Sequence, residues 1–221
     1  MAILTLESKW REYGSTYTFS FSSKRPVRFE AGQYAHIALP RVAAKFAKPT
    51  HEFSIASSPG DPDIRITTDT GSKSAYKQQM EALKPGDHVL LYKVKGEMKL
   101  PENAHGTYVM LAGGIGITPF RSILRDIDKQ KTAVTPVLIH VGNPPYLYEN
   151  ELTDKPFEQY RIQRSGIDTT LQEVRASHPE SHYFVAGSEA FVGAMAKKLE
   201  ATGIPRDMIV TDEFEGLKDT V

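Results

Sequence analysis

The sequence of 221 residues contains no cysteine. This absence excludes disulfide bonds, thiolate zinc sites, iron–sulfur clusters and cysteine nucleophiles. The seven histidines do not fall into a zinc spacing such as His-Glu-x-x-His, so we predict no metal site. Any redox chemistry of the chain would therefore depend on a bound organic cofactor.

Long hydrophobic runs and an excess of one charge are also missing. No apolar run approaches the ~20 residues that a membrane helix needs, and residues 1–10 lack the basic and apolar regions of a secretory signal. The 27 basic and 27 acidic side chains cancel, which argues against nucleic acid as a partner. We therefore expect a cytoplasmic protein without a transmembrane segment.

The first half of the chain is typical of an antiparallel β-barrel. Short stretches of alternating apolar and polar residues are separated by turn sequences, with one helix expected at 74–83. The expected strands are 3–10, 17–21, 34–39, 53–56, 64–67 and 88–93. Short strands at this spacing indicate an antiparallel barrel or sandwich.

After residue 104 the chain alternates apolar strands with helices. The expected strands are 108–112, 136–141, 160–163, 183–186 and 208–211, and the expected helices are 119–129, 148–154, 170–177 and 189–202. Strands that are apolar on both faces and separated by helices predict a parallel five-stranded sheet in an α/β domain. We therefore predict two domains, a β-barrel over 1–103 and an α/β domain over 104–221.

Closely spaced glycines follow the strand expected at 108–112. Thr118 is predicted as the N-cap of the next helix and Pro119 as its first residue. Gly114 and Gly116 would let the backbone approach a ligand, and the helix N-terminus would offer N–H groups to a diphosphate. The last glycine of the dinucleotide fingerprint is missing, so spacing alone also allows a turn without a ligand.

A second segment of this kind follows the strand expected at 64–67. Gly71, Ser72, Lys73 and Ser74 precede the expected helix, and either serine would cap it. The segment suits a second phosphate group, although an ordinary capped helix explains the same residues.

Four segments in this order resemble the ferredoxin–NADP reductase superfamily. They are Thr-His-Glu-Phe-Ser-Ile-Ala-Ser-Ser at 50–58, Gly-Ser-Lys-Ser at 71–74, Gly-Gly-Ile-Gly-Ile-Thr-Pro at 113–119 and Val-Ala-Gly-Ser-Glu at 185–189. Ala-Gly-Gln-Tyr at 31–34 and Lys-Pro-Gly-Asp at 84–87 match further landmarks of its flavin domain. The resemblance covers almost the whole chain and implies an FAD-binding β-barrel followed by an NAD(P)-binding α/β domain.

The resemblance implies that the first of these segments holds the flavin. The superfamily has Arg-x-Tyr-Ser, whereas this chain has His51, Phe53 and Ser54 at the motif positions. Phe53 would keep the ring that packs on the isoalloxazine, and the Ser54 hydroxyl would lie near the reactive N5 edge. The replacement of arginine by His51 removes a permanent charge that binds phosphate, because histidine is mostly neutral above its reference pKa of ~6.5.

Two consequences of this replacement stay open. Either FAD, which the resemblance favours over FMN, is held more weakly, or it depends more on Gly71, Ser72 and Ser74. In the alternative interpretation, His51 is a surface histidine without a ligand.

By the same resemblance, a nicotinamide nucleotide would bind the α/β domain. Its diphosphate site would be lined by Gly114, Gly116, Thr118 and Pro119. The Cys-Gly-Pro that the superfamily places near the nicotinamide ring is replaced here by Ala186, Gly187 and Ser188. Because a small apolar residue still admits the ring, we expect an altered rate rather than lost activity.

The segment at 212–216 resembles the acidic and aromatic C-terminal segment of the superfamily. Glu213 would position protons and Phe214 would cover the flavin ring, unless both are residues of a solvated tail. No arginine follows the strand at 136–141, which favours NADH. Because Arg121, Arg161 and Arg164 would also suit a 2′-phosphate, the choice between NADH and NADPH stays open.

The resemblance implies a flavin-dependent NAD(P)H oxidoreductase with Ser54 and Glu213 as its catalytic residues. Hydride would pass from NAD(P)H to FAD, and electrons would then pass to ferredoxin, flavodoxin, a haem protein or a ferric chelate. Docking to a membrane or to a multi-component redox partner is left open. The alternatives are a reductase of free flavin and a nucleotide-binding regulatory or docking subunit without turnover.

Overall fold

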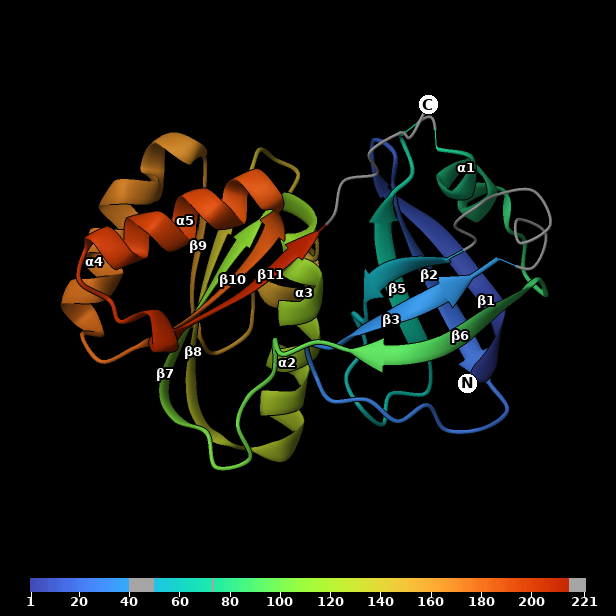
Figure 1. Cartoon of the computed structure of the whole chain (residues 1–221), viewed down its shortest axis with the longest axis horizontal. Helices are drawn as coiled ribbons and strands as arrows, with labels where there is room; N and C mark the ends of the chain where they lie inside the picture. The colour runs from blue at the N-terminus through green and yellow to red at the C-terminus, as the bar shows by residue number, and fades with distance from the viewer. Residues whose placement is uncertain (40–49, 73, 215–221) are drawn as a thin grey trace.

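The structure is a computed structural model, and it describes residues 1–39, 50–72 and 74–214. The chain forms two units side by side, an antiparallel sheet that curls into a barrel and an α/β unit with a parallel sheet (Figure 1). The predicted fold class is therefore confirmed.

The barrel is built from the first half of the chain. Its elements are β1 (Ala2–Tyr13), β2 (Thr16–Ser23), β3 (Tyr34–Ala38), β4 (Thr50–Ser54), β5 (Ile64–Asp69), α1 (Ala75–Ala82) and β6 (His88–Lys95), with strand order β4-β3-β6-β1-β2-β5. Side chains alternate between the inside and the outside of the barrel along each strand, which gives the alternating apolar and polar sequence pattern. In β3, Ala35 and Ile37 are fully buried in the barrel, while Tyr34 and His36 face outward and are partly exposed.

The two end strands of this order, β4 and β5, leave a seam in the barrel wall. They meet only just beyond β4, where Ile55 bridges Ile66 and the Ala56 N–H donates to the Arg65 carbonyl at 2.8 Å. Helix α1 packs on the barrel and buries Tyr76 in its core.

The α/β unit is built from the second half of the chain. Its strands are β7 (His105–Gly113), β8 (Ala133–Val141), β9 (Glu158–Ile162), β10 (His182–Ser188) and β11 (Ile209–Phe214), all parallel and in the order β11-β10-β7-β8-β9. Its helices are α2 (Ile117–Gln130), α3 (Glu149–Leu152), α4 (Ile167–Ser177) and α5 (Glu189–Ala201), with 3₁₀ turns η1 (Gly114–Gly116), η2 (Arg164–Gly166) and η3 (Arg206–Met208).

Helices cover both faces of the parallel sheet, as the doubly apolar strands predicted. Val109 and Leu111 of β7 pack in a core with α4 and α5, whereas Met110 and Ala112 pack with α2. Strand order reverses between β7 and β10, the point at which open α/β sheets bind ligands. β11 ends beside the barrel (Figure 1).

Helix α2 fixes the α/β unit to the barrel. Arg121 is only 1% exposed, and it donates to the Ala56 carbonyl at 2.5 Å and to the Glu151 carboxylate at 2.8 Å. Ser122 donates to the Ser57 carbonyl at 2.6 Å. These contacts join the two units through buried groups, so the carboxyl ends of the parallel strands are held at one position against the barrel.

Asp61 adds a charged contact to this interface. Burial alone would raise the pKa of its carboxyl, but hydrogen bonds from Arg125 and Lys129 outweigh burial and lower the pKa to about 2. The Arg125 contact is 3.2 Å and the Lys129 contact is 2.5 Å. Asp61 is therefore ionised in the folded protein at neutral and mildly acidic pH.

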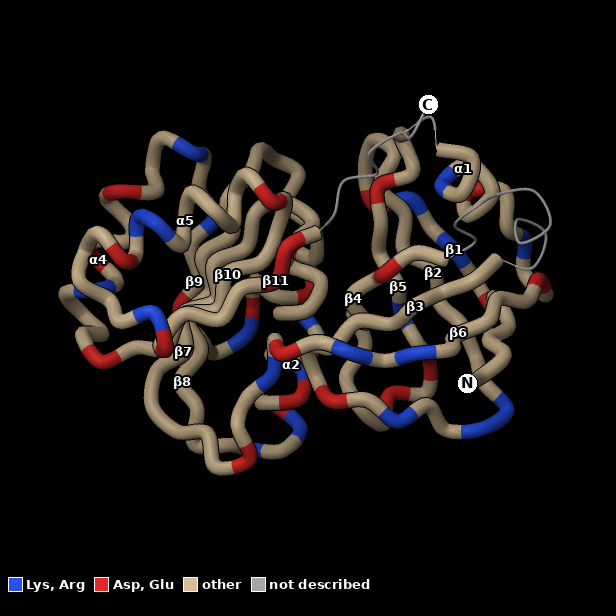
Figure 2. The backbone as a smooth tube through the Cα atoms, in the orientation of Figure 1, with Lys and Arg blue, Asp and Glu red and all other residues tan. Residues whose placement is uncertain are grey.

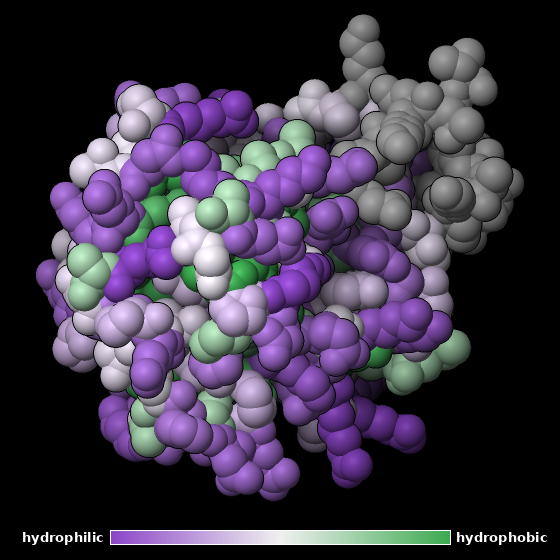
Figure 3. Space-filling view, turned by 60° about the vertical axis from the view of Figure 1, so that its left-hand side comes forward, coloured by the Kyte–Doolittle hydropathy of each residue, from purple (hydrophilic) through white to green (hydrophobic). Residues whose placement is uncertain are grey.

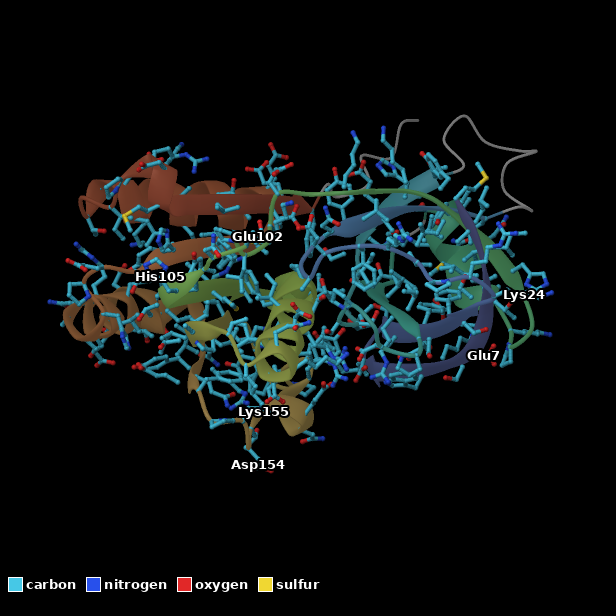
Figure 4. All side chains as sticks on the ribbon, turned by 90° about the horizontal axis from the view of Figure 1, so that it is seen from below. Glu7, Lys24, Glu102, His105, Asp154 and Lys155 are labelled. Carbon is cyan, nitrogen blue, oxygen red and sulfur yellow. The ribbon has the colours of Figure 1, made fainter. Side chains whose placement is uncertain are left out.

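The segment between β6 and β7 links the two units. Figure 4 labels Glu102 and His105 where the α/β unit begins, and Glu7 and Lys24 on the barrel. The predicted boundary between residues 103 and 104 falls between the last barrel strand and β7. The division into domains 1–103 and 104–221 stays a prediction.

Basic and acidic residues occur along the backbone of both units (Figure 2), so neither unit carries charge of one sign alone. On the face of Figure 3, hydrophobic residues show only as small patches among hydrophilic ones. Within 1–39, 50–72 and 74–214, no helix has the length and apolar character needed to cross a membrane.

Candidate functional site

The glycine segment lies at the reversal point between β7 and β10. Gly114 has a φ of +53°, and a Cβ added there would meet nothing within 4 Å. A Cβ on Gly116 would lie 2.1 Å from the Ala186 carbonyl oxygen. Gly114 thus faces open space while Gly116 packs against β10, and α2 begins immediately afterwards. Bare backbone beside a helix N-terminus fits the diphosphate of a dinucleotide.

The predicted helix start in this segment is wrong. Gly116 is the N-cap of α2, Ile117 is its first residue, and Thr118 and Pro119 lie within its first turn. The helix begins earlier because η1 runs directly into it. The Thr118 hydroxyl does not cap but donates back to the Ile115 carbonyl at 3.1 Å. The predicted nucleotide contacts of Thr118 and Pro119 stay predictions.

His140, at the end of β8, supports the same segment. Its Nε2 lies 2.8 Å from the Gly114 carbonyl, and its ring packs edge-on against Tyr146. Burial lowers the pKa of His140 to about 4. The imidazole is therefore neutral at neutral pH and donates from Nε2 to the Gly114 carbonyl.

The end of β10 forms the other wall of the reversal point. Ala186 is fully buried, and the Phe191 ring of α5 lies against the glycine backbones of Gly113 and Gly187. The Ser188 hydroxyl caps α5 by accepting from the Phe191 N–H at 3.3 Å. The contact of Ala186 and Gly187 with a nicotinamide ring stays a prediction.

On the barrel, β4 divides the predicted flavin residues between its two faces. His51 and Phe53 pair with the inward residues of β3, whereas Ser54 pairs with the outward Tyr34. Ser54 is 8% exposed and Phe53 is 6% exposed. The Phe53 ring stacks on Tyr76 of α1 at 6.0 Å between centroids. The predicted isoalloxazine contacts of Phe53 and Ser54 stay predictions.

His51 lies beside α1 at the seam of the barrel. Its ring meets the Tyr76 ring edge-on at 4.0 Å between centroids. His51 is partly buried rather than a fully exposed loop residue. This position is next to the glycine and serine segment that precedes α1.

The segment at 71–74 is less open than predicted. The Gly71 N–H already donates to the Asp69 carboxylate at 2.9 Å, and that carboxylate also accepts from the Ser15 hydroxyl at 2.5 Å. Ser74 is the N-cap of α1, but its side chain makes no capping hydrogen bond. Ser72 is exposed, and Lys73 lies outside the described residues. Phosphate binding by this segment stays a prediction.

The carboxyl end of β11 brings a carboxyl group to the domain junction, which we define as Tyr34, Glu52, Ser54 and Asp212. Burial first, and the nearby Glu52 charge second, raise the pKa of Asp212 to about 6. Burial and the charges of Glu52 and Asp212 also raise the pKa of Tyr34. Asp212 and the outer face of β3 and β4 therefore share one electrostatic environment.

Sequence reasoning selected Glu213 and missed Asp212. Glu213 is exposed, whereas Asp212 and Phe214 are partly buried. The sequence shows that Asp212 and Glu213 are adjacent, but no sequence pattern indicates which of the two carboxylates is the more buried. The roles of Glu213 and Phe214 stay predictions, and residues 215 and 216 of the same segment lie outside the described residues.

The three arginines considered for a 2′-phosphate have different surroundings. Arg121 is buried at the domain interface and contacts Glu151, so it is not available to a nucleotide. Arg161 lies 3.8 Å from Glu149, and Arg164 begins η2.

Similarity to known proteins indicates the family to which the sequence is related. No protein-family model matches the sequence. The chain is 22% identical over 232 residues to the flavohemoprotein of Bacillus subtilis (strain 168), covering 94% of this chain and 57% of the relative. It is 28% identical over 141 residues to the NAD(P)H-flavin reductase of Aliivibrio fischeri, covering 61% of this chain and 53% of the relative. The chain thus spans little more than half the length of these curated relatives.

Among solved structures, the chain is similar to a ferredoxin NADP+ reductase from Neisseria gonorrhoeae with bound FAD and NADP. The TM-score is 0.79 at 20% identity, and the match covers 96% of this chain and 98% of that one. At this identity the likeness establishes the fold. The resemblance seen in the sequence is therefore confirmed, and the chain has the two-domain fold of the ferredoxin–NADP reductase superfamily.

Proposed function

We propose that this chain is a flavin-dependent NAD(P)H oxidoreductase that binds FAD on the barrel and NAD(P)H on the parallel sheet, in the cytoplasm. The observation that carries the proposal is the domain junction. Ser54 of β4 pairs with Tyr34 of β3, and the charge of Asp212, at the end of β11 in the other domain, contributes to the raised pKa of Tyr34. The glycine turn η1 also contacts β5 of the barrel. When bound, NAD(P)H would supply a hydride and the flavin would supply a group that accepts it and can reduce a further acceptor.

The residues of the chain would bind, orient and exclude water. The open backbone at Gly114 and the N-terminus of α2 would hold the nucleotide diphosphate. The Ser54 hydroxyl would donate to the flavin ring at the junction, and the buried contacts of Arg121 would keep the two binding surfaces in register. We assign the holding and release of a proton near neutral pH to Asp212 rather than to Glu213, because burial and the Glu52 charge raise the pKa of Asp212 to about 6.

The acceptor is proposed only by class. A flavin that takes up two electrons and releases them singly would serve ferredoxin, flavodoxin, a haem protein or a ferric chelate. Because the chain has no cysteine for a cluster of its own, a separate partner or domain would complete the electron path.

A second candidate, a reductase of free flavin, is favoured by two observations. His51 stands where the superfamily has arginine. The Gly71 N–H donates to the Asp69 carboxylate and is therefore not free to bind a phosphate. Both features would lower the affinity for a flavin diphosphate, compared with a protein that has the arginine of the superfamily motif. In that case flavin would be a diffusing substrate rather than a resident cofactor.

One spectroscopic experiment tests the proposal. The absorbance spectrum of the purified protein is recorded, and NADH and then NADPH are added without oxygen, with and without added FAD, FMN or riboflavin. We expect a flavin band that is bleached by one of the nucleotides. A colourless protein that oxidises NAD(P)H only with added flavin would indicate the free-flavin reductase. A folded protein that neither binds flavin nor oxidises NAD(P)H would contradict both.

Replacing Asp212 by asparagine should increase stability above pH 6. The folded-state pKa of about 6 lies above the ordinary value of 3.8, so ionisation of Asp212 destabilises the fold as pH rises between these values. Because solvent screens this partly exposed carboxylate, we expect the free energy of unfolding of Asp212→Asn to exceed that of the wild type by about 1–2 kcal/mol at pH 8 and to equal it at pH 3.5. Urea unfolding at the two pH values measures the difference.

Glu213→Gln is the matched control, since Glu213 is the adjacent exposed carboxylate. It should leave the pH dependence of unfolding unchanged. In turnover assays, the inflection near pH 6 in NAD(P)H oxidation should disappear in Asp212→Asn and persist in Glu213→Gln. If the inflection instead persists in Asp212→Asn and disappears in Glu213→Gln, Glu213 rather than Asp212 holds the proton.

A further inference from the structure

Lys77 of α1 lies in the seam between β4 and β5. Its ammonium donates to the Thr68 hydroxyl of β5 and lies 4.9 Å from the centroid of the Phe53 ring of β4. Phe53 is 6% exposed and Thr68 is 5% exposed. Because its contacts come from both strands, the ammonium occupies the gap that separates them.

This lysine is a cation without an ion pair in the part of the chain that the structure describes. Burial lowers the pKa of Lys77 to about 8, and the charge of Asp69 opposes that shift only in part. The Asp69 carboxylate accepts from Ser15 and Gly71 instead. A partly desolvated ammonium with a hydroxyl and a ring as its contacts is stabilised when an anion comes close.

The surroundings of Lys77 indicate which anion this would be. His51, which stands in place of the superfamily's phosphate-binding arginine, packs on Tyr76, the residue next to Lys77. Ser74, whose side chain does not cap α1, precedes Lys77 by three residues. A lysine, an imidazole and a hydroxyl therefore lie on or beside α1, close to the strand position where the arginine charge is missing.

We propose that Lys77 binds a phosphate group of the flavin nucleotide and supplies the charge that arginine supplies elsewhere in the superfamily. The inference rests on the proposed function. It differs from the sequence prediction, which assigned this task to His51, Gly71, Ser72 and Ser74. A lysine is a point charge rather than a planar fork, so it neutralises a phosphate without bidentate geometry.

The test compares ligands with and without phosphate. The full-length protein and Lys77→Met are titrated with FAD, FMN and riboflavin, and binding is followed by flavin fluorescence or calorimetry. Methionine keeps the apolar stem and removes the charge. We expect affinity for FAD and FMN to fall at least about tenfold, with less than about a twofold change for riboflavin. Lys77→Arg should retain most of the affinity for the phosphorylated flavins.

Two further measurements keep the outcomes distinct. Lys198→Met, on the exposed surface of α5, is the control for loss of a lysine and should change none of the three affinities. If Lys77→Met does not fold, Lys77→Gln keeps a polar contact to Thr68 and gives the same comparison. An equal loss for all three flavins, or no loss, would overturn the role of Lys77 in phosphate binding. A wild-type protein that binds none of the three would overturn the proposed function itself.

Discussion

Replacing Arg121 by methionine should lower the free energy of unfolding by about 3 kcal/mol, because a buried charged contact loses one partner. The guanidinium is 1% exposed and donates to the Ala56 carbonyl and the Glu151 carboxylate. It also lies 5.1 Å from the centroid of the Tyr148 ring. Methionine would fill part of the space but leave the fully buried Ala56 without its donor. The midpoint and slope of urea unfolding measure the loss.

Arg125→Met is the control for this prediction. Arg125 lies on the same helix and contacts Asp61 and Glu151 at 3.2 Å, but its side chain is 34% exposed. Because water screens this contact, we expect a loss of no more than about 1 kcal/mol. Under the proposed function, Arg121→Met should also slow NAD(P)H oxidation, because the barrel and the parallel sheet would no longer be held in register. Equal losses for the two variants would show that burial at this interface does not set its energy.

Much of the fold was predictable because local patterns agree with the tertiary structure. Apolar strands alternating with helices predicted every strand of the parallel sheet, and the observed ends differ from the expected ones by up to three residues, mostly as extensions. The extensions have a tertiary cause. His105 and Gly106 join β7 through pairing with Ala133 and Val134 of β8, and such polar or glycine residues carry no strand signal of their own.

Strand β4 shows the limit of local patterns more clearly. The sequence favoured residues 53–56, whereas the strand runs over Thr50–Ser54. Thr50, His51 and Glu52 are polar, but they pair with Ala38, Ile37 and His36 of β3. Only the partner strand shows that these residues belong to the barrel wall.

The candidate site was predictable as segments but not as individual side chains. The glycine segment lies where the spacing placed it, yet the choice between Asp212 and Glu213 depends on which side of β11 meets the barrel. That choice is set by domain packing through groups such as Arg121, far away in the sequence. Lys77 was missed because a lysine in a short helix usually marks a solvated face, and its position in the seam requires β4 and β5 to be apart.

Replacement by alanine should destabilise the fold much more at Gly116 than at Gly114. A Cβ on Gly116 would lie 2.1 Å from the Ala186 carbonyl oxygen and 2.8 Å from the Gly187 Cα. Both are backbone atoms that cannot move aside, so Gly116→Ala should cost about 3 kcal/mol of folding free energy. A Cβ on Gly114 meets nothing, and only its φ of +53° is unfavourable for alanine. We expect that variant to lose about 1 kcal/mol.

Among variants that fold, Gly114→Ala should lose more nucleotide affinity than Gly116→Ala, although it loses less stability. The methyl group of Gly114→Ala would project into the space above the segment, where we place the diphosphate, and should weaken NAD(P)H binding at least about tenfold. Gly193→Ala, in the middle of α5 with nothing within 4 Å, should be neutral in binding and stabilising by about 0.5–1 kcal/mol. Thermal unfolding and nucleotide titration separate the two effects. Unchanged NAD(P)H affinity in Gly114→Ala would mean that the open backbone at this turn does not contact the nucleotide, and the dinucleotide would have to bind elsewhere on the sheet.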